Sequence, residues 1–327
     1  MSPDELTLLA KLYYIDGLTQ EDLARRFHVS RAKVGRLLRH AQDEGIVEIR
    51  VRHHPGATQA LEQALIGRFG IQQAIISVDH ADPDRQRELL AGLVASHLDR
   101  ILTDRGIVAV GVGRNISAVS HHAVSGTRRA CSFVCAIGGS YRGGEAMNAD
   151  HISRRLAARF GGDSETLYAP ALVDDAAQRA SLLANDTVHQ SLARAQRADI
   201  ALIGIGDLLN DGNIERLGWF SPEEIAEAKR AGAVADVMGY NFIDIHGRPI
   251  TEESERHAIG LSIEDLRRIP NVIAVASEPT KITGILGALR SGVVNTLAVT
   301  QAVAQTVLSL AAAASGPAPP QASAPAA

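Results

Sequence analysis

Basic side chains are concentrated near the start of the chain. The stretch from residue 25 to residue 40 contains six lysines and arginines and no acidic residue. The first 52 residues carry nine basic and eight acidic side chains, so the excess acid of this chain of net charge −4 lies beyond them. Arginine and lysine either hydrogen-bond guanine edges in the major groove or neutralise phosphates. A basic unit joined to an acidic body is the charge pattern of a nucleic-acid reader with a second function, although a basic run alone is often a solvated helix face.

The pattern around these basic residues predicts a helix–turn–helix. Apolar residues at helical spacing predict helices over 4–15, 20–27 and 31–44, with Thr19 and Ser30 as the N-caps of the second and third. A strand with period two is expected over 46–51. In this motif the second helix of the pair enters the major groove, while a helical hairpin used for dimerisation is the alternative. The DNA contacts that we expect come from Thr19, Gln20, Ser30, Arg31, Lys33, Arg36 and Arg39.

A second chemical signal is the glycine turn Gly-Val-Gly-Arg-Asn-Ile-Ser at residues 111–117, which follows the apolar stretch IVAV and opens a predicted helix. Glycines let backbone amides approach an anion, and a helix N-terminus favours negative charge. Arg114 and Ser117 would add a cation and a hydroxyl. A plain strand-to-helix turn that needs glycine is the alternative. The third glycine and the later acid of a dinucleotide site are missing.

Three further turns end predicted strands at the same edge of the expected sheet: 138–140, 204–207 and 278–281. Open parallel sheets bind ligands at the carboxyl ends of their strands, so these turns favour a polar small-molecule site. Lys281 would lie in the first turn of a helix, which is unfavourable unless it faces an anion or an acid such as Glu278. Asp236 lies in an apolar run, where it needs a ligand hydroxyl or a cationic side chain as a partner.

Apolar segments alternate with helical patterns from about residue 70, which predicts an α/β fold with a mostly parallel sheet covered on both faces. We expect a domain over 1–52, a linker over 53–60, a second domain over 61–312 and a disordered Ala/Pro tail over 313–327. The expected strands span 74–78, 107–110, 131–137, 200–205, 234–237, 241–245, 272–276 and 296–299. The expected helices span 84–103, 114–124, 148–160, 187–197, 221–230, 280–290 and 300–312.

Several classes of protein are disfavoured by the same sequence. No run of apolar residues is long enough to cross a membrane, and the start lacks the pattern of a signal peptide. Two cysteines, four residues apart in one strand, cannot form a disulfide framework, so we expect a cytoplasmic protein with both thiols in its core. The adjacent histidine pairs at 53–54 and 121–122 lack the spacing of zinc ligands. Neither a metal, a cofactor nor a catalytic activity is therefore expected.

Taken together, these motifs resemble the SorC/DeoR-like family of sugar-binding transcriptional regulators over residues 6–310. The N-terminal likeness lies in GLTQEDLARRFHVSRAKVGRLLRHAQDEGIVEIRV. The likeness of the remainder lies in GVGRNIS, IGGSYRGGEAMNADHISRRLAARFGG, ADIALIGIGDL, GAVADVMGYNFIDIHGRPI and VIAVASEPTKITGILGALRSGVVNTLAVTQAVAQTVL.

The resemblance implies a winged helix–turn–helix domain and a Rossmann-like effector domain related to sugar-phosphate isomerases and deaminases. It implies a homo-oligomer, usually a tetramer built from dimers, that binds double-stranded operator DNA. It also implies control of a carbohydrate or polyol catabolic operon by a sugar, polyol or sugar phosphate, with repression the expected sign. The effector-binding residues that it implies are Gly111, Gly113, Arg114, Asn115, Ser117, Gly139, Arg142, Asp236 and Lys281.

The chain departs from the family pattern at positions that bear on the effector. Asn115 stands where the family usually has Thr, Ser277-Glu278 replaces a Gly-Gly step, and Gln301 replaces an acid. These changes leave open whether the effector is phosphorylated. Two other functions also stay open: an isomerase or deaminase with Asp207 or Asp236 as its general base, and an oligomerisation module with an unused pocket.

Overall fold

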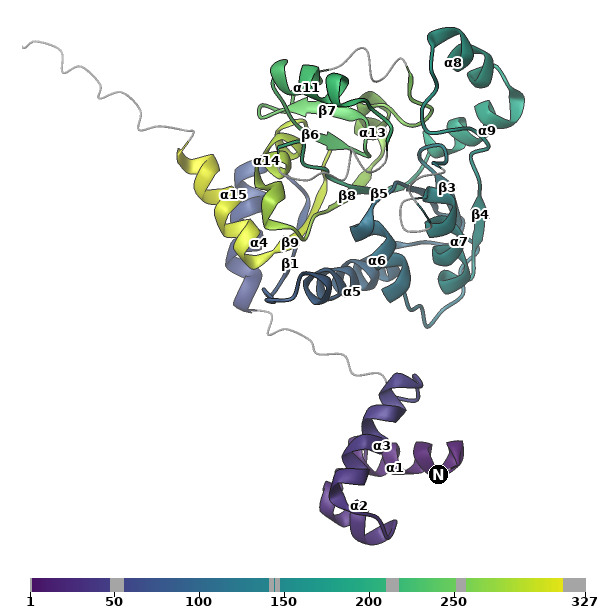
Figure 1. The fold of residues 1–327 in the computed structure, drawn as a ribbon, viewed down its shortest axis with the longest axis vertical. Helices are drawn as coiled ribbons and strands as arrows, with labels where there is room; N and C mark the ends of the chain where they lie inside the picture. The colour runs from purple at the N-terminus through teal and green to yellow at the C-terminus, as the bar shows by residue number, and fades with distance from the viewer. Residues whose placement is uncertain are drawn as a thin grey trace, which may run out of the picture. The chain divides into compact units, whose positions relative to one another are not determined.

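The computed structural model describes residues 2–47, 56–140, 144, 148–209, 218–250 and 257–313. The chain divides into two units, Met1–His54 and Pro55–Ala327 (Figure 1). Each unit has a hydrophobic core of its own.

Three short helices form the N-terminal unit: α1 (Pro3–Tyr14), α2 (Gln20–Arg26) and α3 (Arg31–Asp43). The predicted N-caps are confirmed, because Thr19 Oγ1 accepts a hydrogen bond from the Asp22 amide and Ser30 Oγ accepts one from the Lys33 amide, each at 3.2 Å. Capping places both helix starts at defined residues. The side chains buried between the helices are Leu9, Leu12, Leu23, Val34 and Leu38.

A seven-stranded sheet is the centre of the larger unit, and every neighbouring pair of its strands is parallel. The mostly parallel sheet predicted from the apolar runs is therefore confirmed. Its spatial order is β1 (Gln73–Ser77), β9 (Thr296–Thr300), β8 (Asn271–Val275), β5 (Ile200–Gly204), β2 (Ile107–Val110), β3 (Ser132–Cys135) and β4 (Asp163–Glu165).

Helices cover both faces of this sheet. Successive residues of a strand point to opposite sides, so apolar strands give the sheet two apolar faces. Val108 and Val110 of β2 pack into one cluster, and Ala109 packs into the other. The first cluster is completed by α5 (Pro83–Ile101), α6 (Arg114–His122) and α7 (Ala149–Phe160). The second is completed by α4 (Gly56–Phe69), α9 (Asp186–Ala195), α11 (Pro222–Arg230), α13 (Ile263–Arg268), α14 (Ile282–Arg290) and α15 (Gln301–Ala313).

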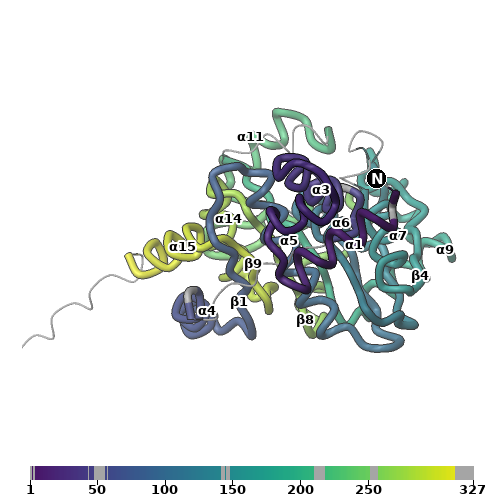
Figure 2. Tube along the Cα trace, turned by 90° about the horizontal axis from the view of Figure 1, so that it is seen from below, coloured from purple at the N-terminus to yellow at the C-terminus, as the bar shows by residue number. Residues whose placement is uncertain are grey.

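The first and last helices of this unit meet beside β1. Arg68 of α4 donates from Nη2 to the Ala311 carbonyl of α15 at 2.8 Å, and α4 and α15 lie together at one side of the unit (Figure 2). Buried Leu65, Val303 and Val307 pack into the core beneath them.

Two of the predicted strands leave the main sheet. β6 (Ala233–Val237) and β7 (Asn241–Asp244) pair antiparallel in a separate hairpin. Its turn contains Met238 at φ +62° and Gly239 at φ +90°, a left-handed conformation that costs a non-glycine residue free energy. The amide of Gly239 donates to Asp236 Oδ1 at 2.6 Å, which holds this turn in place.

Other expectations are corrected or fall outside the described residues. The linker expected over 53–60 is wrong for residues 56–60, which begin α4; Thr58 Oγ1 donates to Glu62 at 2.9 Å in its first turns. β4 and α8 (Ala176–Leu183) were not expected, because the strand sequence Asp-Ser-Glu is polar and the helix buries no side chain. Three parts of the expected organisation lie outside the described residues: 48–51 of the expected strand, 53–55 of the expected linker and 314–327 of the expected tail. The last described residue, Ala313, ends α15.

We predict that Phe133→Ala lowers the free energy of unfolding of the larger unit by about 3–5 kcal/mol, because it opens a cavity under α7. Phe133 is fully buried, and its ring centroid lies 5.7 Å from that of Phe160. Urea unfolding followed by circular dichroism measures the change. Leu310→Ala is the control, since this side chain on α15 is 41% exposed and its loss should have little effect. Equal destabilisation by both variants would contradict the packing described for β3.

Candidate functional site

The order of the strands defines where a ligand site is expected. From β2 the chain moves outward through β3 to β4, and from β5 it moves the opposite way through β8 to β9. The direction therefore reverses between β2 and β5, and ligands of open α/β sheets bind beyond the carboxyl ends of the strands at such a point. The glycine turn 111–117 follows β2 at this place.

The two glycines of this turn have different structural roles. Gly111 donates its amide to the Leu202 carbonyl at 2.9 Å, and a Cβ there would lie 3.2 Å from that carbonyl and 3.6 Å from Met238 Cγ. Gly113, at φ +122°, is the N-cap of α6 and provides no side-chain cap. The N-terminus of α6 therefore begins at the switch point with a positive helix dipole, as the sequence predicted for an anion site.

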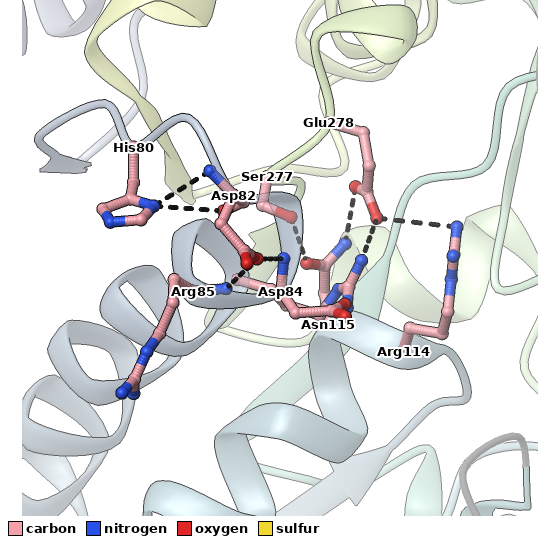
Figure 3. A network of polar contacts seen from close by, with 9 residues as sticks. His80, Asp82, Asp84, Arg85, Arg114, Asn115, Ser277 and Glu278 are labelled. Carbon is pink, nitrogen blue, oxygen red and sulfur yellow. Dashed lines mark hydrogen bonds and ion pairs between the residues drawn. The ribbon is translucent and has the colours of Figure 1, made fainter.

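A carboxylate of the chain itself occupies the region in front of this helix. Glu278 follows β8, and its Oε2 accepts a hydrogen bond from Asn115 Nδ2 at 2.9 Å (Figure 3). Ser277 Oγ in turn donates to Asn115 Oδ1 at 2.8 Å. Asn115, Ser277 and Glu278 thus link the ends of β2 and β8 across the end of β5.

Three cationic side chains surround Glu278. Lys281 Nζ lies 3.1 Å from Oε2, and Nη2 of Arg114 and of Arg87 each lie 3.8 Å from Oε1. Arg87 also contacts Asp84 at 2.6 Å, and both belong to α5, whose start is fixed by the Asp82 cap (Figure 3). The Lys281 side chain is only 8% exposed, so its charge depends on this partner.

The electrostatic balance keeps Glu278 ionised. Burial alone would raise the pKa of its carboxyl, but the Lys281 charge, the hydrogen bonds from Asn115 and Lys281, and the Arg87 charge lower the pKa to about 2. Its Oε1 is buried and accepts no hydrogen bond from the residues that the structure describes. The site therefore contains a permanent negative charge with one unused acceptor.

Asp236 and Gly284 border a common neighbour, Gly206. A Cβ on Gly206 would overlap Asp236 Oδ2, and a Cβ on Gly284, in the first turns of α14, would lie 2.9 Å from the Gly206 carbonyl. Asp236 is buried and accepts from the Gly239 amide through Oδ1. Its observed role is thus to hold the β6–β7 turn beside the site.

The remaining effector residues expected from the sequence lie less centrally. Ser117 is buried in the first turn of α6, and its amide donates to the Gly113 carbonyl at 2.9 Å. Gly139 donates its amide to the Ala169 carbonyl and accepts from the Ala171 amide, so both its backbone groups serve the fold. Arg142 lies outside the described residues.

The sequence did not indicate Arg87 as a site residue. It indicated Glu278 as a departure from the family pattern and as a possible partner of Lys281. Arg87 lies on an amphipathic helix with Asp84 three residues before it, which is the pattern of an ordinary surface pair. Nothing in its local sequence signals a partner nearly two hundred residues away. The partner of Lys281, by contrast, was available from the sequence, since Glu278 precedes it by three residues.

The basic residues of α3 are exposed along the helix. Val34 and Leu38 are buried, while Arg31, Lys33, Arg36 and Arg39 are exposed. At the start of α2, Thr19 Oγ1 bonds with Asp22 within the cap. Gln20 Oε1 would lie 3.7 Å from a Cβ on Gly35, an ordinary van der Waals distance, so the Gln20 side chain of α2 lies next to α3.

The described residues contain neither a metal-binding cluster nor a membrane-spanning helix. Among the described residues, no group of three or more His, Cys, Asp and Glu side chains could hold a metal ion. Within the same part of the chain, no helix is long and apolar enough to span a membrane. Cys131 and Cys135 are both buried and unpaired by a disulfide, as expected.

Comparison with known proteins relates both units to one family. Residues 53–309 match the family described as "putative sugar-binding domain". The transcriptional regulator LsrR of Klebsiella pneumoniae is 30% identical over 93% of this chain and 92% of its own length. The chain belongs to the SorC/DeoR-like family of sugar-binding transcriptional regulators. The sorbitol operon regulator of the same species is 27% identical over 92% of this chain and 96% of its own.

Solved structures of this family share the fold. A sugar-binding domain of a transcriptional repressor from Vibrio fischeri is 42% identical, with a TM-score of 0.73 over 78% of this chain and 99% of that domain. The full-length sorbitol operon regulator SorC from K. pneumoniae is 25% identical, with a TM-score of 0.76 over 94% of this chain and 99% of its own. The relatives are transcriptional regulators, which supports regulation over the enzymatic alternative.

We predict that Glu278 makes the stability of this family member depend on acid. Because its pKa falls from 4.5 unfolded to about 2 folded, its ionised form stabilises the fold above about pH 4.5, and this contribution is lost as the pH falls towards 2. The loss is on the order of 3 kcal/mol. Urea unfolding between pH 6 and pH 2 should therefore show a shallower decline for Glu278→Gln than for the wild type.

Glu88→Gln is the matched control. It removes the same charge from an exposed pair with Arg85 on α5, so its pH profile should follow that of the wild type. Parallel profiles for Glu278→Gln and the wild type would show that Glu278 is not held ionised by its neighbours.

Proposed function

We propose that this SorC/DeoR-like regulator binds double-stranded operator DNA through its N-terminal helix–turn–helix. A sugar-type effector that binds at the β2–β5 switch point then changes its affinity for this DNA. The observation that carries the proposal is the exposed basic side of α3 opposite its buried Val34 and Leu38. A helix that inserts into the major groove needs this division between a packed face and a basic face.

The positions of the basic residues suit groove entry. Arg31, Lys33 and Arg36 occupy the first two turns of α3, where a recognition helix contacts base edges. Thr19 and Gln20 begin α2, whose N-terminal amides favour a backbone phosphate. Arg39 extends the same exposed side towards the end of α3. Arginine and lysine here would read guanine or neutralise phosphates.

The effector-binding half of the proposal rests on the cluster formed by Arg114, Asn115, Glu278 and Lys281. These side chains come from the start of α6, from the segment after β8 and from the start of α14, so a ligand among them would bridge separate elements. A ligand changes DNA affinity only if it binds two arrangements of the protein unequally. A bridging ligand meets this condition, because it favours one relative position of the loops.

The sign of regulation and the kind of operon are inferred from the relatives. We infer repression of a carbohydrate or polyol operon, because the 42% identical Vibrio fischeri domain belongs to a repressor and other relatives regulate sorbitol or deoxyribonucleoside operons. We infer that the protein acts in the cytoplasm, where operator DNA is found in bacteria. We also infer that it is a homo-oligomer, because two copies of the helix–turn–helix would read two half-sites one helical turn apart.

The enzymatic alternative has weaker support from the site. A general base must be positioned to reach a substrate proton. Asp236 Oδ1 accepts from the Gly239 amide and Asp207 Oδ1 accepts from the Leu209 amide at 2.7 Å, so each carboxylate serves a turn. Binding without turnover fits these roles better.

The decisive experiment is a titration of the purified protein onto its own promoter fragment, followed by fluorescence anisotropy at several salt concentrations. Tight, salt-dependent binding that a sugar, polyol or sugar phosphate shifts would support the proposal. A folded protein that binds no promoter fragment at low salt would refute it, and the same sugar phosphates would then be assayed for isomerisation.

We predict that Arg36→Ala weakens operator binding by about 1–3 kcal/mol, which is roughly 5- to 150-fold, because one groove or phosphate contact is lost. Anisotropy titrations at two salt concentrations measure the loss. Arg85→Ala removes the same charge from an exposed pair on α5 and should leave the affinity unchanged. Unchanged affinity in Arg36→Ala would argue against groove entry by α3.

We predict that Lys281→Met abolishes the effector response while operator affinity stays within about twofold, since it removes a buried cation of the effector site and touches no DNA-binding residue. The readout is the anisotropy change on adding the panel member that shifts the wild type. Lys229→Met, on the exposed side of α11, is the control and should respond normally. A full response in Lys281→Met would exclude Lys281 from the site.

A further inference from the structure

The most unusual feature of the site is an anion supplied by the chain at the place where an anionic ligand would bind. Glu278 lies in front of the N-terminus of α6 and is 15% exposed. Lys281, Arg114 and Arg87 face its two oxygens. A phosphoryl group entering here would find each of these cations already beside a carboxylate and a fixed negative charge among them.

The polar groups that a phosphate would use are also engaged. Asn115 Nδ2 donates to Glu278 Oε2, and Lys281 Nζ lies 3.1 Å from the same oxygen. Nη1 of Arg87 contacts Asp84 at 2.6 Å. A phosphoryl oxygen would have to displace the carboxylate from these partners, and like charges only a few ångströms apart repel strongly in a partly buried site.

A hydroxyl group, unlike a phosphoryl group, can donate a hydrogen bond to this carboxylate. Glu278 Oε1 accepts no hydrogen bond, and its neighbours Arg87 and Arg114 lie 3.8 Å away, beyond hydrogen-bond distance. A carboxylate accepts from several donors at once, and a bond from a hydroxyl to a charged oxygen is stronger than one between neutral groups. Of these two neighbours, Arg114 has the more exposed side chain, at 40% against 13% for Arg87, so the Arg114 side of this oxygen is the one nearer to solvent.

We propose that the effector is an uncharged polyhydroxyl compound, a polyol or free sugar, and that Glu278 selects it by accepting its hydroxyl groups and excluding phosphorylated analogues. This inference rests on the proposed function, because it specifies the ligand class of the same effector site. Asn115 and Lys281 hold the carboxylate in place.

The test compares matched pairs of ligands on the full-length protein. Calorimetry would measure the binding of inorganic phosphate, and of sorbitol, ribose and glucose with their terminal phosphates, to the wild type and to Glu278→Gln. The single tryptophan, Trp219, lies against the Gly239 turn beside the site and gives an independent fluorescence signal. Glu88→Gln is the control for the change in net charge.

The wild type should bind at least one neutral compound at least tenfold more tightly than its phosphate, and inorganic phosphate should not bind. Glu278→Gln keeps an oxygen for Asn115 but removes the charge, so measurable binding of inorganic phosphate should appear and the affinity for the sugar phosphates should rise at least tenfold. Glu278→Ala is the second variant if the glutamine form does not fold, and the same gain is expected. Glu88→Gln should match the wild type.

Three results would overturn the inference. They are tighter binding of a phosphorylated compound than of its neutral partner by the wild type, no gain of phosphate affinity in either Glu278 variant, and no binding of any compound to either protein. The first would mean that an anion displaces Glu278. Promoter binding, measured separately by anisotropy, decides the proposed function, so a DNA-binding protein that responds to a sugar phosphate would refute this inference alone.

Discussion

The ion pair between Glu278 and Lys281 is the interaction on which the proposed effector site depends. Each charge is largely removed from water, which is costly unless a partner compensates it. Asn115 and Arg87 complete the compensation from α6 and α5. Loss of any one member would leave a buried charge or amide without its partner, so these side chains hold the ends of β2 and β8 and the start of α5 as a group.

Close backbone approaches set the position of this group relative to the β6–β7 hairpin. Gly206 has no room for a side chain because the Asp236 carboxylate lies against it, and Gly284 has none because Ala235 would lie 2.8 Å away. The hairpin and the start of α14 therefore pack on the backbone that follows β5. The strained Met238–Gly239 turn is retained at the same place, which agrees with the tendency of strained residues to gather at functional sites.

The sequence was informative where one pattern had one structural explanation. Short apolar runs rich in β-branched residues and followed by glycine, such as Ile107–Val110, favour buried strands, and the caps Thr19 and Ser30 mark helix starts through local hydrogen bonds. β4 escaped notice because its polar residues pair with β3 at the edge of the sheet. Arg87 escaped because the contact that gives it meaning joins α5 to the end of β8, and local spacing carries no information about such a contact. The DNA-binding residues and the ligand class stay predictions.

The span of the contacts in this protein has a consequence for its synthesis. The three-helix unit is closed by contacts within its first few dozen residues, whereas the bond from Asn115 to Glu278 joins residues 163 positions apart and β1 finds its partner only when β9 has been made. At ordinary elongation rates this interval is on the order of tens of seconds. During it, the residues of the N-terminal unit are all present, while the contacts between the ends of β2 and β8 cannot form. Each new copy therefore passes through a period in which the proposed effector site is incomplete.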